Sequence, residues 1–150
     1  MSREKPLPSE QACTDVVTVF LVHQGKILLM KRSNRVRTYQ GHWAAVSGYL
    51  ESPDPLQQAY IELAEEVGLE EADVTLRQAG ACLEVRDQAR GRLWRVHPFL
   101  FSVKSPKKIR LDWEHTEMQW VSPQELGNFR TVPALAETLE RVLADHGLDQ

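Results

Sequence analysis

Short stretches of β-branched and aromatic residues divide the first third of the chain into strands. Residues 16–22 are almost entirely of this kind, and residues 26–30 repeat the pattern after His23, Gln24 and Gly25. Because a glycine in a tight connection accepts a positive φ, the two segments are expected to form a β-hairpin. A further short apolar strand is expected at residues 43–47, ending at Gly48.

Helical spacing replaces this pattern after Gly48. Asp54 is a favoured N-cap, Pro55 suits the first helical position, and Gln57 is placed to complete a capping box. Gly68 is typical of a C-terminal stop. The apolar positions between these signals recur every three or four residues and predict a helix over 55–67 with one buried face: Leu56, Ala59, Tyr60, Leu63 and Val67.

The remaining pattern completes a mixed fold. Residues 74–86 and 92–103 are expected to be two long strands joined by a polar turn, and residues 117–121 a last strand. A capping-box motif at 122–125 predicts a short helix, and an amphipathic helix is expected from about 131–133 to near Gly147. This order predicts an α/β (α+β) fold, an α/β/α sandwich with a mixed central β-sheet flanked by helices. Residues 1–150 are expected to form a single domain, with 1–13 as a loose N-terminal arm.

Composition excludes several classes of protein. The 150 residues carry a net charge of −3, so no basic field favours duplex nucleic acid. The longest apolar runs are far shorter than a membrane span, and no signal peptide is recognisable. Two isolated cysteines, Cys13 and Cys82, fit a reducing compartment. A cytoplasmic protein is therefore expected.

Three carboxylates are the first candidates for chemistry. Glu62, Glu65 and Glu66 stand at i, i+3 and i+4, so a helix presents them on one side, where they repel one another. A divalent cation would remove this repulsion, because hard cations such as Mg²⁺ prefer carboxylate oxygens. Taken alone, the triplet is more simply explained as a solvated helix face.

The context of the triplet resembles the Nudix box, whose pattern is a glycine loop, an acid, then Arg-Glu-apolar-x-Glu-Glu-x-Gly-apolar. Residues 62–69 match the second half at every fixed position, and residues 47–51 are similar to the first half, with Gly48 as the loop glycine. Residues 25–29, residues 120–121 and the closing helix are also similar to the family. The resemblance therefore covers nearly the whole chain.

The resemblance implies a Mg²⁺-dependent pyrophosphohydrolase, with Mn²⁺ as an alternative ion, acting on a diphosphate bond in a nucleoside diphosphate derivative or nucleotide. A small-molecule nucleotide is then the expected partner, without a membrane or duplex nucleic acid, and a homodimer is an alternative to a monomer. It also implies that Gly48, through its carbonyl, and the helix carboxylates bind the metal. A further base or ligand is expected from Glu114 or Glu117, and we assign the catalytic role to Glu62, Glu65, Glu66 and Glu117.

Two departures from the family pattern leave other functions open. The family arginine before the first helix glutamate, which orients a catalytic glutamate, is Ile61 here, and the loop after Gly48 is one residue shorter. A nucleotide-sensing module with weakened catalysis is therefore one alternative. An enzyme similar to isopentenyl-diphosphate isomerase is another, with Cys82 as the only plausible thiol, although a buried inert thiol is the simpler interpretation.

Substrate contacts are expected from the segment after the first hairpin. Lys31, Arg32, Arg35 and Arg37 are four cations within seven residues, and we predict that the three arginines bind phosphate, with Tyr39 beside them. A surface charge cluster is an equal alternative. Aromatic residues that could stack on a base, though packing is their commoner role, are Tyr39, Trp43 and Trp94. Three histidines lack metal spacing and are interpreted as structural: His42, His97 and His115.

Overall fold

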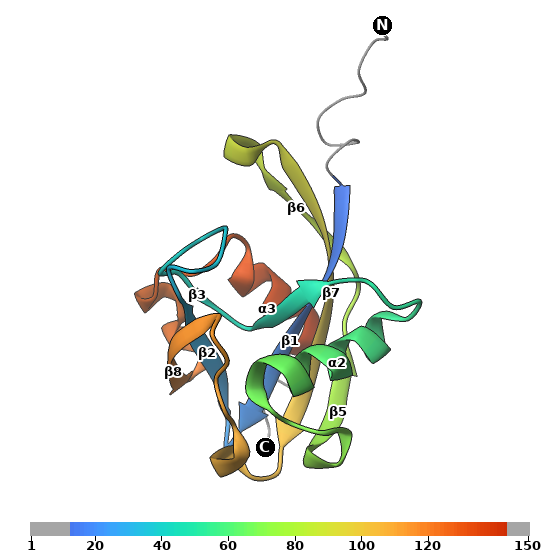
Figure 1. The fold of residues 1–150 in the computed structure, drawn as a ribbon, viewed down its shortest axis with the longest axis vertical. Coiled ribbons are helices and arrows are strands. Elements are labelled where there is room, and N and C mark those ends of the chain that lie inside the picture. Colours follow the sequence, from blue (N-terminus) through green and yellow to red (C-terminus); the bar gives the residue numbers. More distant parts are fainter. Residues whose placement is uncertain (1–12, 144–150) are drawn as a thin grey trace, which may run out of the picture.

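A central β-sheet with a helix on each face forms the body of the molecule (Figure 1). The computed structural model describes residues 13–143. The strands are β1 (Cys13–His23), β2 (Lys26–Arg32), β3 (Trp43–Ala44), β4 (Val46–Tyr49), β5 (Val74–Ala79), β6 (Leu83–Asp87), β7 (Arg92–Val103) and β8 (His115–Val121). The helices are α2 (Pro55–Val67) and α3 (Leu135–Leu143). The predicted fold class is confirmed.

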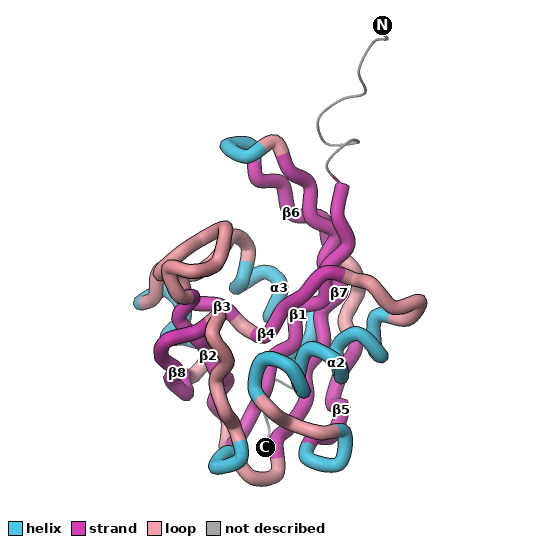
Figure 2. The backbone as a smooth tube through the Cα atoms, in the orientation of Figure 1, coloured by secondary structure: helices cyan, strands magenta, loops and turns pink. Residues whose placement is uncertain are grey.

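The sheet is mixed, as predicted. Strand β1 pairs with β7 in parallel, and all other strand pairs are antiparallel. The path β3–β2–β1–β7–β5 is extended by β4 on β1, β6 on β7 and β8 on β2. The β6–β7 hairpin extends beyond the helical layers (Figure 2). Residue 13 belongs to β1 and not to the predicted loose arm, whose other residues lie outside the described chain.

Alternation along β1 builds two cores. Val17, Val19 and Leu21 face α2, where they pack with Ala59, Leu63 and Val67. The intervening Phe20 and Val22 face α3 and pack with Leu135, Leu139 and Val142. Because successive strand side chains point to opposite faces, a strand buried on both faces needs an unbroken apolar run, which residues 16–22 provide apart from Thr18.

The predicted strand over 74–86 is wrong in one respect, because β5 and β6 are separate. Both pair with β7, but the pairing stops between Phe99 and Val96. Pro98 lies in this gap and has no N–H group to donate, while its carbonyl accepts a hydrogen bond from Gly80 at 2.9 Å. A side chain at Gly80 would collide with the backbone of Arg141 in α3. The interruption therefore follows from a proline opposite a close contact between helix and chain.

The expected strand at 43–47 also divides. Trp43 and Ala44 pair with β2, whereas Val46 to Tyr49 pair with β1, so the chain crosses between neighbouring strands at Ala45. Gly48 therefore lies within β4, paired with Val17, and does not end the strand. This crossing places Gly48 directly beneath α2.

Both long helices follow their sequence signals with small differences. Helix α2 has the predicted bounds, with Asp54 accepting from the Leu56 N–H group at 3.2 Å and Gly68 left-handed at φ 72°. The capping box predicted for Gln57 is wrong, because Gln57 is exposed; the neighbouring Gln58 instead accepts from the N–H groups of Glu51 and Ser52 in the loop before the helix. Helix α3 begins at Leu135, later than predicted, because the chain before it is bonded to β3. The Trp43 N–H group donates to the carbonyl of Arg130, and the Val132 N–H group donates to the carbonyl of Trp43. The predicted end near Gly147 lies outside the described residues.

Residues 123–128 form a 3₁₀ helix, and its capping box between Ser122 and Glu125 is confirmed. None of the helices within residues 13–143 is long and apolar enough to cross a membrane.

Candidate active site

A cleft of about 340 Å³ opens beside α2 and β4. Its volume is that of a pocket for a small molecule. Carboxylates form one part of its lining, and aromatic and aliphatic side chains form another. The acidic residues are Glu51, Glu62, Glu65, Glu66 and Glu114, and the aromatic residues are Tyr39, Tyr49 and Trp94.

The three helix carboxylates all line this cleft. Glu62 and Glu66 are buried, at 9% and 3% exposure, whereas Glu65 is exposed. A solvated helix face is therefore excluded for Glu62 and Glu66, because such a face leaves its charges in water. The fold thus brings Glu62, Glu65 and Glu66 together at one cleft, while their role as metal ligands stays a prediction.

Gly48 and Glu62 are in close approach between β4 and α2. A Cβ atom built on Gly48 would overlap the carboxylate group of Glu62. Gly48 has an ordinary extended backbone within β4, so space and not φ requires glycine here. Any larger residue would move the Glu62 carboxylate from its present position.

Glu66 has the most perturbed carboxyl group in the cleft. Burial raises its pKa well above the ordinary value, and the charges of Glu114, Glu62 and Asp112 raise it further. The Ser47 N–H group lies 3.4 Å from Glu66 Oε1, the distance of a weak hydrogen bond. Burial also raises the pKa of Glu62. Carboxyl groups with raised pKa values are typical of functional sites, because folding alone does not favour burying like charges together.

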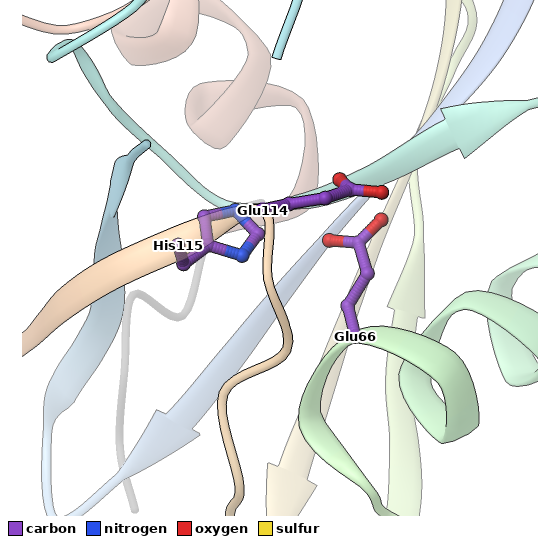
Figure 3. Close-up of side chains that lie close together, drawn as sticks. All are labelled: Glu66, Glu114 and His115. Carbon is purple, nitrogen blue, oxygen red and sulfur yellow. The ribbon is translucent and has the colours of Figure 1, made fainter. Parts of the chain in front are cut away.

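Glu114 and His115 bring two further groups to Glu66 from the start of β8 (Figure 3). One carboxylate oxygen from each glutamate and one ring nitrogen of His115 lie within 4.8 Å of one another. His115 Nδ1 finds no hydrogen-bond partner within residues 13–143, although Asp112 Oδ1 is 3.4 Å away. Burial lowers the pKa of His115, which favours the neutral ring. The histidine interpreted as structural thus belongs to the acidic cluster.

These residues fit a divalent cation. A carboxylate oxygen of Glu66 in α2 and one of Glu114, just before β8, lie together with a ring nitrogen of His115. Within residues 13–143 the charge of Arg32 acts on Glu66 and Glu114, and a single positive charge does not balance the acidic cluster. A bound Mg²⁺ or Mn²⁺ would supply the missing positive charge.

The two candidates for a further base or ligand, Glu114 and Glu117, lie in different places. Glu114 is half-buried and lines the cleft. Glu117 is exposed on β8, where it forms an ion pair with Lys31 at 3.6 Å, and it does not line the cleft. The structure therefore does not place our predicted catalytic residue Glu117 with the helix carboxylates.

Only part of the basic segment at residues 31–37 reaches the cleft. Arg32 and Tyr39, two of the four predicted substrate-binding residues, line the cleft, while their contact with substrate stays a prediction. Arg32 donates to the carbonyl of Thr38 at 3.0 Å, which holds its side chain beneath the loop. Arg35 and Arg37 are exposed and do not line the cleft, and the guanidinium of Arg35 stacks on Trp113.

Aromatic side chains line part of the same cleft as the acidic residues. The rings of Tyr49 and Trp94 are 6.3 Å apart at their centroids, and both line the cleft. Tyr39 donates a hydrogen bond to Asp87, which joins its loop to the tip of the β6–β7 hairpin. Trp43 instead packs against the core near α3. Tyr49 was not predicted, because a single exposed tyrosine after a glycine carries no pattern.

The two cysteines are free and take no part in the cleft. Cys82 lies between β5 and β6 and is exposed, not buried in a strand as predicted.

Comparison with known families gives one match along this chain. The model of the NUDIX domain matches residues 13–143. A comparison with curated protein sequences gives no match.

Solved structures share the fold. A Nudix hydrolase from M. smegmatis, RenU, has a TM-score of 0.66 at 21% identity, covering 87% of this chain and 82% of its own. The E. coli ORF135 protein has a TM-score of 0.65 at 27% identity, covering 87% and 88%. A C. elegans Ap4A hydrolase has a TM-score of 0.67 at 18% identity, covering 87% and 93%.

Proposed function

The chain belongs to the NUDIX domain family and is a pyrophosphohydrolase of that superfamily; we propose that it cleaves a diphosphate bond in a nucleoside diphosphate derivative or nucleotide and depends on Mg²⁺. One observation carries the metal dependence. Glu66 is 3% exposed beside other carboxylates; burial and then their charges raise its pKa, and a divalent cation would relieve this cost.

Each acidic residue has a place in this proposal. Glu62, Glu65, Glu66 and the Gly48 carbonyl would hold the ion. When bound, the ion would neutralise phosphate oxygens and lower the pKa of a water molecule. Glu114 lines the cleft close to Glu66 and would accept the proton from the attacking water; burial raises its pKa above the ordinary value, which makes it a stronger base. The water oxygen then bonds to phosphorus, and the bridging oxygen leaves with the other phosphate. Arg32 would bind substrate phosphate beside this point.

Two other functions have less support. An isomerase of the isopentenyl diphosphate type needs a thiol at the reacting carbon, and neither Cys13 nor Cys82 lines the cleft. A sensor without turnover has no need of buried, mutually repelling carboxylates. A cytoplasmic location, a single domain and a homodimer remain predictions from the sequence.

The aromatic lining supports a nucleoside on the substrate. Replacing Trp94 by alanine is expected to raise KM for a nucleotide substrate about tenfold, because stacking on one base contributes roughly 1–3 kcal/mol. Trp113→Ala is the matched control, since Trp113 is 53% exposed and does not line the cleft. Steady-state kinetics of both variants give the comparison. An unchanged KM in Trp94→Ala would contradict the proposal that the substrate base stacks on Trp94.

A release assay over nucleotide sugars, dinucleoside polyphosphates, ADP-ribose and (d)NTPs, with Mg²⁺ and with Mn²⁺, tests the function itself. We expect phosphate-ester products from at least one compound. Glu65→Gln should lower the rate at least about a hundredfold, as does the loss of a catalytic electrostatic group. Glu137→Gln, an exposed glutamate on α3, should not. A rearranged diphosphate would indicate an isomerase, and tight binding without turnover would indicate a sensor.

A further inference from the structure

Gln58 is a buried polar residue to which the proposed chemistry assigns no role. Its exposure is 2%, and it stands one helical turn before Glu62 in α2. A buried amide group is costly unless its donors and acceptors are bonded. The side chain of Gln58 makes three hydrogen bonds, two to the loop before α2 and one to a carboxylate of the cleft.

The carbonyl oxygen of the Gln58 side chain holds the loop after Gly48. It accepts hydrogen bonds from the backbone N–H groups of Glu51 and Ser52, both at 2.9 Å. These groups belong to the connection between β4 and α2 that is one residue shorter than the family pattern. Gln58 thus fixes the shortened loop to the helix that follows it.

The amide nitrogen of Gln58 holds a carboxylate of the cleft. It donates to Glu62 Oε2 at 2.9 Å. The two backbone N–H groups determine which way the amide is turned, because only its oxygen can accept from them. The NH₂ group must therefore face Glu62, and the loop and the carboxylate are oriented by one side chain.

The family arginine that would orient a catalytic glutamate is absent from this chain. Ile61 occupies its position, is 38% exposed and has no hydrogen-bond donor on its side chain. The task of orienting a helix carboxylate therefore falls to another residue if the site is to turn over. Gln58 lies three positions earlier on the same helix and makes contact with Glu62 directly.

We propose that Gln58 is a positioning residue that replaces the missing arginine, by joining the shortened loop to the carboxylate of Glu62. The inference rests on the proposed function for its effect on turnover. The hydrogen bonds themselves are testable without it. A residue outside a metal site that orients a ligand is worth about 10- to 100-fold in metal affinity or activity.

Two variants of Gln58 separate its two contacts. Gln58→Met keeps the length of the side chain and removes both, whereas Gln58→Glu keeps an acceptor for Glu51 and Ser52 and removes the donor to Glu62. The neighbouring Gln57 is exposed, so Gln57→Met makes the same chemical change beside the site without touching it. All measurements belong at a temperature well below the melting temperature of each variant.

Amide hydrogen exchange measures how firmly the loop is held, and kinetics measure whether the Glu62 carboxylate is correctly positioned. In Gln58→Met, exchange at Glu51 and Ser52 should accelerate at least about tenfold, as expected when a local opening loses its hydrogen bonds. Its kcat should fall about 10- to 100-fold with KM nearly unchanged, since positioning acts on the transition state. Gln58→Glu should lose kcat to a similar extent but retain slow exchange. Gln57→Met should resemble the parent in both.

Several results would overturn the inference. Unchanged exchange in Gln58→Met, parental kcat in Gln58→Glu, or equal losses in Gln57→Met would each do so. A parent without hydrolase activity would instead reject the proposed function, and the exchange data would still show whether Gln58 holds the loop.

Discussion

Glutamine in place of Glu66 is expected to remove most turnover while making the metal-free protein more stable. Glu66 is 3% exposed, and its neighbours in the cleft include Glu114 and Glu62. Loss of this carboxylate should lower kcat about 100- to 1,000-fold, on the scale of a catalytic electrostatic group. The same change removes a buried charge that the fold stabilises poorly, so the melting temperature should rise by about 2–4 °C for each kcal/mol relieved.

The pH dependence of stability gives this prediction a definite sign. The folded-state pKa of Glu66 is raised above the ordinary value of 4.5, so the folded protein binds more protons than the unfolded chain above that pH. The free energy of unfolding of the metal-free parent therefore falls as pH rises from about 4.5 through the raised pKa. Glu66→Gln should lack this component of the decline.

Thermal unfolding between pH 4 and 8 in the presence of a chelator measures the effect. Glu137→Gln removes an exposed glutamate and should follow the parent curve. A Glu66→Gln protein that is less stable than the parent at pH 8 would contradict the idea that folding bears a cost for this charge.

Alanine at Gly48 is expected to damage activity far more than stability. The added Cβ would overlap the end of the Glu62 side chain, which can turn aside. Displacing a catalytic group by about 1 Å can cost about a hundredfold in rate. We therefore expect kcat to fall by about that factor, with a loss of stability of about 1–3 kcal/mol or less, the range for overpacking.

Two other glycines calibrate this result. Gly127 has open space around its Cβ position, so Gly127→Ala should change neither property. At Gly80 the obstacle is the backbone of Arg141, which cannot turn aside, so Gly80→Ala should lower stability while leaving kcat unchanged at a permissive temperature. Kinetics and denaturant unfolding of the three variants should give this order. Parental turnover in Gly48→Ala would show that Glu62 needs no particular position.

Local sequence signals predicted the parts of the site that lie within one element. Asp54, Pro55 and Gly68 mark the ends of α2, and the i, i+3, i+4 spacing places its carboxylates on one side. These inferences need only the geometry of a helix. The two faces of the sheet likewise follow from the apolar run in β1 and the stripes on α2 and α3.

Contacts between residues far apart in the sequence could not be predicted from these local signals. Glu114 and Glu117 are equally acidic in sequence, and only the pairing of β8 with β2 carries Glu117 to Lys31 while leaving Glu114 at the cleft. His115 reaches Glu66 for the same reason. Arg35 and Arg37 extend into solvent because the loop after β2 turns Arg32 and Tyr39 inward, and no residue spacing encodes that turn.

Gln58 shows a further limit of sequence reasoning. A glutamine in the first turns of a helix is normally solvated, and nothing local distinguishes Gln58 from Gln57. The distinction arises because the apolar stripe of α2 turns Gln58 toward the sheet and Gln57 toward solvent. Loss of the family arginine at Ile61 was visible in the sequence, but its structural compensation was not.

Direct titration of the metal is the most searching test of the account. Mn²⁺ binding to the parent without substrate, followed by electron paramagnetic resonance or calorimetry at pH 8, should detect a site that Mg²⁺ competes for. Glu66→Gln should bind Mn²⁺ at least about tenfold more weakly, because a carboxylate ligand is lost, and Glu137→Gln should bind it as the parent does. Equal affinity in the parent and Glu66→Gln would contradict the claim that these buried carboxylates exist to hold a divalent cation.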